Sequence, residues 1–179
     1  IVYTQYQGRY MDIGKAFRDI EKDGKDYFSN CPTFGIYYDN PREIIDQTKC
    51  RAVIGFVIGK KDQKDFVSKM NGKYEFKSLP STLGLQSYFL YKFQFSILIG
   101  VFKVIPALAK AAYNCEVVKG MKKVNCGITE IYHIYNSDDK YIEYLIPIGP
   151  EHLEYCLSNK GTPEYKIGGK FIEMLKKFE

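Results

Sequence analysis

The sequence predicts an α+β fold built from two strand-helix-strand-strand modules, followed by extra helices at the C-terminal end. Two observations support this prediction. The chain has 179 residues, of which 45% are hydrophobic, and this length and composition favour one domain with one substantial core. Segments with strand and helix periodicity also occur in the same order twice. We expect the domain to cover residues 1–148, with halves at about 1–60 and 61–148.

The first half begins with a run of β-branched and aromatic residues that favours a strand. A helical period then starts at Met11, where Asp12 is the expected N-cap and Gly24 the expected end. Two further apolar segments are separated by a turn at Asp39-Asn40-Pro41. The expected elements are strands at 1–6, 33–38 and 51–58 and one helix between the first two strands.

The second half repeats this order after a short helical connector at 63–70. The expected elements are strands at 74–78 and 83–92, a helix at 95–113, and a hairpin of strands at 128–135 and 141–148. Apolar residues cover most of the circumference of the 95–113 helix, which predicts heavy burial. Lys103, Pro106 and Lys110 interrupt this segment, so we do not expect it to cross a membrane.

Residues 149–179 are expected to form a helical extension. Ile167, Phe171, Leu175 and Phe178 recur at helical spacing and form one apolar stripe. Such a stripe packs either on its own domain or on a partner protein, and both alternatives stay open.

Charge and cysteine usage narrow the function. The net charge of +5 comes from 26 basic and 21 acidic residues with few arginines, so we expect no nucleic-acid binding. The five cysteines are odd in number and widely spaced, which favours reduced thiols in a cytosol-facing compartment over a disulfide framework. No spacing of His, Cys or acidic residues indicates a metal site, and we expect no cofactor.

Two short sequence motifs carry a family resemblance. They are Gly35-Ile36-Tyr37-Tyr38-Asp39-Asn40-Pro41 and Lys49-Cys50-Arg51-Ala52-Val53-Ile54-Gly55. With weaker motifs such as Phe76-Lys77-Ser78-Leu79-Pro80 and Glu130-Ile131-Tyr132, they make the chain resemble the gyrase-inhibitor-like (GyrI-like) superfamily over roughly residues 1–148. Within that superfamily the chain is similar to the testis-expressed protein 264 family.

The resemblance implies two modules of the SHS2 type, related by pseudo-twofold symmetry, with a ligand groove between them. Relatives bind small, often cationic molecules or proteins there, and a few hydrolyse reactive compounds. The testis-expressed branch is a membrane-anchored adaptor of the endoplasmic reticulum that acts in reticulophagy. Neither the N-terminal anchor nor the acidic tail of that branch is visible in this sequence, so membrane attachment would come from a segment absent from this chain.

The candidate groove residues are Glu130, Tyr132, Tyr37 and Tyr91. Glu130 matches the groove glutamate of the family and would hold a cation or act as a general base if desolvated; strand alternation could instead point it to solvent. For any single tyrosine, packing in the core is the more common role than contact with a ligand. Cys50, beside two basic residues, is either an activated thiol or a buried cysteine at the start of a strand.

The sequence leaves three functions open. The first is a non-catalytic ligand- or protein-binding domain of a membrane-associated adaptor, facing the cytosol at the endoplasmic reticulum or another organelle membrane. The second is a structural subunit of a large assembly. The third is a binder or hydrolase of a small cationic or hydrophobic molecule that uses Glu130.

Overall fold

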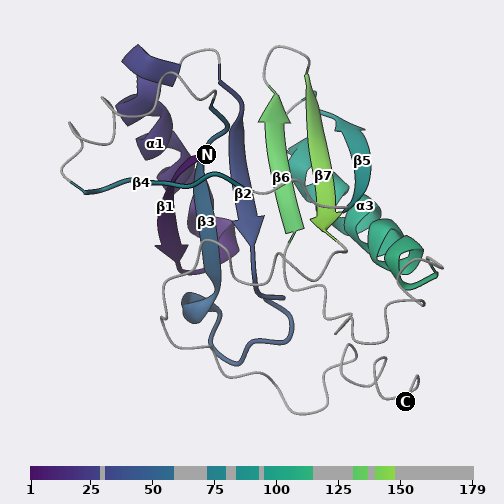
Figure 1. Cartoon of the computed structure of the whole chain (residues 1–179). Helices are drawn as coiled ribbons and strands as arrows, with labels where there is room; N and C mark the ends of the chain where they lie inside the picture. The colour runs from purple at the N-terminus through teal and green to yellow at the C-terminus, as the bar shows by residue number, and fades with distance from the viewer. Residues whose placement is uncertain are drawn as a thin grey trace.

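The computed structural model describes residues 1–28, 31–58, 72–79, 84–92, 95–114, 131–136 and 140–147. These residues form two α-helices and an antiparallel sheet of seven strands (Figure 1). The elements in chain order are β1 (Val2–Gln7), α1 (Ile13–Phe28), β2 (Thr33–Tyr37), β3 (Arg51–Phe56), β4 (Glu75–Phe76), β5 (Gly84–Leu90), α3 (Phe95–Asn114), β6 (Ile131–Asn136) and β7 (Tyr141–Pro147). The α+β class predicted from the sequence is therefore confirmed.

The strands lie in the order β4-β1-β3-β2-β6-β7-β5. Each pair of neighbours is antiparallel. Strands β2 and β6 come from different halves of the sequence and meet near the middle of the sheet, where Gly35 pairs with His133. We call the junction of β2 and β6 the seam. Both helices lie on the same face of the sheet, α1 over the first half and α3 over the second (Figure 1).

Helix α1 packs through a stripe of apolar residues onto β1 and β3. Its buried residues are Ile13, Ile20, Gly24 and Phe28. The sequence predicted that Gly24 ends the helix. This was wrong, because α1 continues to Phe28 and Gly24 lies where the helix packs against the sheet. A Cβ atom at Gly24 would lie 2.5 Å from the ring of Phe56, so the absent side chain lets helix and sheet approach closely.

The predicted N-cap of this helix also differs. Asp12 ends a short 3-10 helix (Tyr10–Asp12) that precedes α1, and its carboxylate accepts a hydrogen bond from Arg9 Nε at 2.8 Å. Other boundaries shift by a few residues, as expected where helix and strand ends fray. The strand expected at 74–78 shortens to β4, and the strand expected at 83–92 becomes β5.

Helix α3 is less buried than its composition predicted. A single stripe of residues four apart, Ser96, Gly100, Val104 and Leu108, is buried against the sheet, whereas Phe102 is 54% exposed. Pro106 lies inside the helix. In the part of the chain that the structure describes, no helix combines the length and the apolar character needed to span a membrane.

The opposite face of the sheet is also buried at its centre. Phe34, Ile36 and Tyr38 of the segment that contains β2 pack there with Tyr3 and Val53. Tyr37 instead packs on the helix-covered face, against the cluster that includes Ile13 and Ile20. The prediction that Tyr37 and Tyr38 point to opposite faces is confirmed, as the period of two in a strand requires.

Candidate binding site at the seam of the sheet

A row of aromatic side chains crosses the seam on the helix-covered face. The Tyr37 and His133 rings have centroids 4.6 Å apart, and the His133 and Tyr144 centroids are also 4.6 Å apart. Tyr135, two residues after His133 on β6, has its hydroxyl 3.3 Å from that of Tyr37. We call Tyr37, His133, Tyr135 and Tyr144 the seam cluster.

Two glycines, one from each half, make room for this cluster. Gly35 lies directly opposite His133, and a Cβ atom there would be 2.9 Å from the Tyr37 ring. On α3, a Cβ atom at Gly100 would be 2.0 Å from the hydroxyl of Tyr144. Real Cβ contacts do not come so close, so any side chain at either position would displace a tyrosine of the cluster.

His133 is the central polar group of the cluster and lies between β2 and β7. The residue is 3% exposed, and this burial lowers the pKa of its imidazole from 6.5 to about 3. The ring is therefore neutral at physiological pH. Its Nδ1 lies 3.4 Å from the Tyr135 hydroxyl, whereas its buried Nε2 has no hydrogen-bond partner among the described residues.

The tyrosines of the cluster are neutral as well. Burial raises the pKa of Tyr37 to about 12, although the hydrogen bond with Tyr135 opposes this shift. Burial also raises the pKa of Tyr135 and Tyr144. The Tyr144 hydroxyl donates to the carbonyl of Ile97 on α3 at 3.4 Å. The cluster thus consists of uncharged aromatic rings with one ring nitrogen that none of the described residues satisfies.

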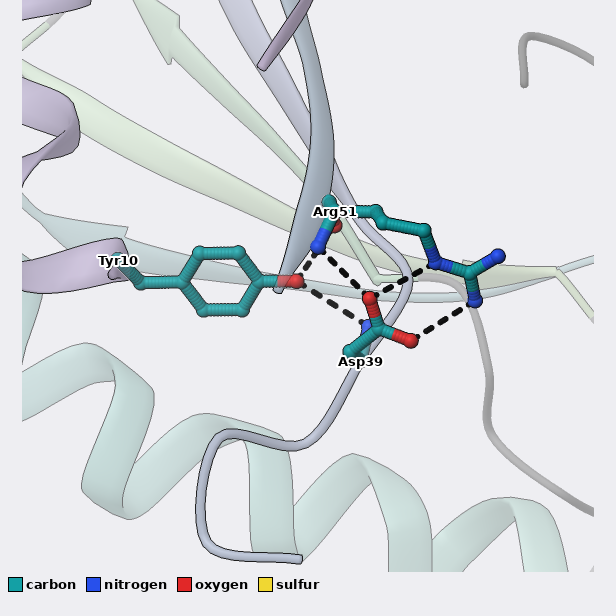
Figure 2. A network of polar contacts seen from close by, with 3 residues as sticks. All are labelled: Tyr10, Asp39 and Arg51. Atoms are coloured by element: carbon teal, nitrogen blue, oxygen red, sulfur yellow. Dashed lines mark hydrogen bonds and ion pairs between the residues drawn. The ribbon is translucent and has the colours of Figure 1, made fainter. Parts of the chain in front are cut away.

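The cluster is bordered on the α1 side by a buried polar network (Figure 2). Arg51 Nη2 lies 2.8 Å from Asp39 Oδ1, and Arg51 Nε donates to Asp39 Oδ2 at 3.0 Å. The backbone N–H of Arg51 donates to the same carboxylate at 2.7 Å. Tyr10 donates to the Arg51 carbonyl at 2.5 Å and accepts from the Asp39 N–H at 3.1 Å.

The turn interpretation of Asp39-Asn40-Pro41 is confirmed for one residue and is incomplete for another. Asn40 closes the turn, since its Oδ1 accepts from the Arg42 N–H at 3.1 Å. Asp39 does more, because it forms the buried ion pair with Arg51. Cys50 is buried and burial raises the pKa of its thiol to about 11, so the structure favours the buried cysteine over the activated thiol.

The predicted groove residues have different outcomes. Tyr37 is in the seam cluster, and Tyr91 packs against the apolar cluster of α3 and β7 that Tyr135 also contacts. Tyr132 lies in β6, where it pairs with Ile36 and Leu145. Glu130 and the stripe of Ile167, Phe171, Leu175 and Phe178 lie outside the described residues.

His133 was not among the candidate groove residues. Its neighbours in the sequence give no sign of an unsatisfied nitrogen, because its surroundings come from β2, β7 and Tyr135. The available signal was the alternation of β6, in which His133 and Tyr135 occupy the same face. A polar residue in that position, at the centre of an apolar strand, is the feature that requires a partner.

Comparison with protein-family models, curated proteins and solved structures finds no significant match to this chain. Within the described residues, no group of three or more His, Cys, Asp or Glu side chains is placed to hold a metal ion.

Proposed function

We propose that this chain is a non-catalytic binding domain with GyrI-like architecture and that its site is the seam cluster. The observation that carries the proposal is the buried Nε2 of His133, which has no hydrogen-bond partner in the described part of the chain. A buried polar atom without a hydrogen bond costs about 1–3 kcal/mol. A ligand or partner group that hydrogen-bonds this nitrogen would recover that free energy, which favours binding at this position.

The strand order supports the duplicated architecture. On one side of the seam the order from outside inward is β1, β3, β2, and on the other it is β5, β7, β6, while the two-residue strand β4 of the second half is added outside β1. Apart from β4, each half thus places its first strand farthest from the seam, its third in the middle and its second at the seam. Each helix follows the first strand of its half. This equivalence is what two related modules joined across a pseudo-twofold axis require.

The chemistry of the cluster favours a cation with an apolar body. Tyrosine faces attract cations, and a neutral imidazole accepts a hydrogen bond from an ammonium group at Nε2 when its proton is on Nδ1. The Tyr135 hydroxyl oxygen would then accept a hydrogen bond from Nδ1–H. An anion would find no positively charged partner within the seam cluster. The cluster also contains no ionised base or nucleophile, which favours binding over catalysis.

The test compares three probes of similar shape by NMR titration: benzylammonium, benzyl alcohol and benzoate. We expect benzylammonium to bind most tightly and to shift the His133 ring signals. The control is His133→Phe, which keeps an aromatic ring but removes the nitrogen, and we expect it to weaken benzylammonium binding about tenfold. Equal affinity for all three probes, or no effect of the substitution, would contradict the proposal.

We further propose that the domain serves as the binding module of a membrane-associated adaptor on the cytosolic side of the endoplasmic reticulum. This part rests on the resemblance of Gly35–Pro41 and Lys49–Gly55 to the testis-expressed family. The two motifs lie side by side in the structure, where Asp39 forms an ion pair with Arg51. Imaging of the full-length protein in cells against organelle markers tests it, and a purely nuclear or secreted distribution would contradict it.

A further inference from the structure

The Tyr10 side chain connects the buried ion pair to the seam cluster. Its hydroxyl is held by two backbone groups, the carbonyl of Arg51 at the start of β3 and the N–H of Asp39 after β2. The Asp39 carboxylate in turn holds the Arg51 backbone N–H at 2.7 Å. The two strand ends and the tyrosine hydroxyl therefore form one closed set of hydrogen bonds (Figure 2).

The ring of Tyr10 extends from this network to the cluster. Its centroid lies 5.0 Å from that of Tyr37, and the two ring planes meet at 80°. This edge-to-face contact depends on ring orientation. Tyr37 next contacts His133 with centroids 4.6 Å apart. Tyr10 therefore contacts the ring that lies beside His133 while its own hydroxyl is held by two backbone groups.

Apart from its apolar packing against the α1 cluster, Tyr37 has few contacts that fix the orientation of its ring. On its β6 side the Tyr37 hydroxyl has only a 3.3 Å contact with Tyr135, which is long for a hydroxyl pair. The residue two positions earlier on the same strand is Gly35, which lies against the Tyr37 ring and has no side chain to support it. Among the ring neighbours of Tyr37, Tyr10 is the one whose hydroxyl is held by two backbone hydrogen bonds.

We propose that Tyr10 is a positioning residue for the binding site: held through its hydroxyl by the backbone groups of Asp39 and Arg51, it fixes the Tyr37 ring against His133. The consequence for ligand affinity rests on the proposed function, whereas the geometric link does not. A positioning role differs from a general stabilising role because it changes the surroundings of His133 in the folded protein without any ligand.

The experiment compares Tyr10→Phe with Tyr74→Phe by NMR of the His133 ring in the ligand-free protein. Tyr74 is the matched control because its hydroxyl, like that of Tyr10, donates a hydrogen bond, here to Asp23 Oδ2 at 2.7 Å, and because it is buried against α1 away from the seam. We expect Tyr10→Phe to shift the His133 signals and Tyr74→Phe to leave them unchanged. Unchanged His133 signals in a folded Tyr10→Phe protein would overturn the inference.

A second arm measures benzylammonium affinity in the same proteins. We expect Tyr10→Phe to weaken binding about threefold to tenfold, the range that one lost hydrogen bond produces, with no change in Tyr74→Phe. If the wild type does not bind benzylammonium, the proposed function fails while the ligand-free arm still decides the positioning role. If Tyr10→Phe does not fold, Asp39→Asn carries the ligand-free test, with the same expected shift and the same contradicting result.

Discussion

The buried imidazole of His133 makes the stability of the domain sensitive to mild acid. Its pKa of about 3 in the folded protein lies below the ordinary value of 6.5. The unfolded chain therefore binds a proton at this residue as the pH falls below about 6.5, while the folded protein stays neutral there down to about pH 3. The contribution of His133 to the free energy of unfolding is therefore fully present above pH 6.5 and is lost progressively as the pH falls from about 6.5 to about 3.

The magnitude follows from the width of the window. Each pH unit below 6.5 costs about 1.4 kcal/mol, so lowering the pH from 7 to 5 removes about 2 kcal/mol of the free energy of unfolding. The assay is urea denaturation at both pH values, followed by far-UV circular dichroism because the chain has no Trp. His133→Phe should lose about 2 kcal/mol less than the wild type over this interval.

The subtraction isolates His133 because His152, the other histidine, is present in both proteins. Equal acid sensitivity of wild type and His133→Phe would refute the reasoning, since it would mean that His133 titrates alike in the folded and unfolded states. Asp23, whose pKa is lowered by its hydrogen bonds to Lys73 and Tyr74, contributes only at lower pH and is also common to both proteins.

Three further substitutions or treatments test neighbouring parts of the account. Gly100→Ala should destabilise the domain by about 1–3 kcal/mol, because the added methyl group overlaps the Tyr144 hydroxyl; urea denaturation measures this. Arg51→Met should cost about 3–5 kcal/mol in the same assay, because it leaves the Asp39 carboxylate buried without its cation. The Cys50 thiol, with its pKa raised to about 11, should react with a thiol reagent at pH 8 only in the unfolded protein.

Each of these has a clear contradicting result. Gly14→Ala is the matched control for the helix glycine, because its Cβ would meet only Arg18 Nη1 at 3.7 Å, and equal effects at both glycines would contradict the contact with Tyr144. An Arg51→Met protein with unchanged stability would show that the buried Asp39 carboxylate does not need the ion pair. Fast labelling of Cys50 in the folded protein would contradict its burial.

The sequence predicted local features well. The α+β class, the opposite facing of Tyr37 and Tyr38, and the order of strands and helices all follow from local periodicity, which adjacent residues determine. Helix α1 was misjudged at Gly24 because the reason for that glycine is the ring of Phe56, which is distant in the sequence. Propensity alone treats such a glycine as a helix end.

The candidate site was predictable only in part. Tyr37 was proposed from the sequence motif that contains it, but the role of His133 depends on the pairing of β2 with β6 and of β6 with β7. That register brings Tyr37 and Tyr144 to either side of the imidazole, and no local pattern encodes it. The Asp39–Arg51 ion pair was missed for a similar reason, because local turn chemistry already accounted for Asp39, and the motif that contains Arg51 was interpreted through Cys50.

The central claim is that the seam cluster binds a ligand through the Nε2 atom of His133. The most direct test is a ¹⁵N-resolved NMR spectrum of the His133 imidazole in the full chain, recorded with and without benzylammonium. We expect the Nε2 resonance to shift on binding and the probe's aromatic protons to show contacts with the Tyr37 ring. An Nε2 resonance that stays unchanged while benzylammonium binds elsewhere would contradict the claim.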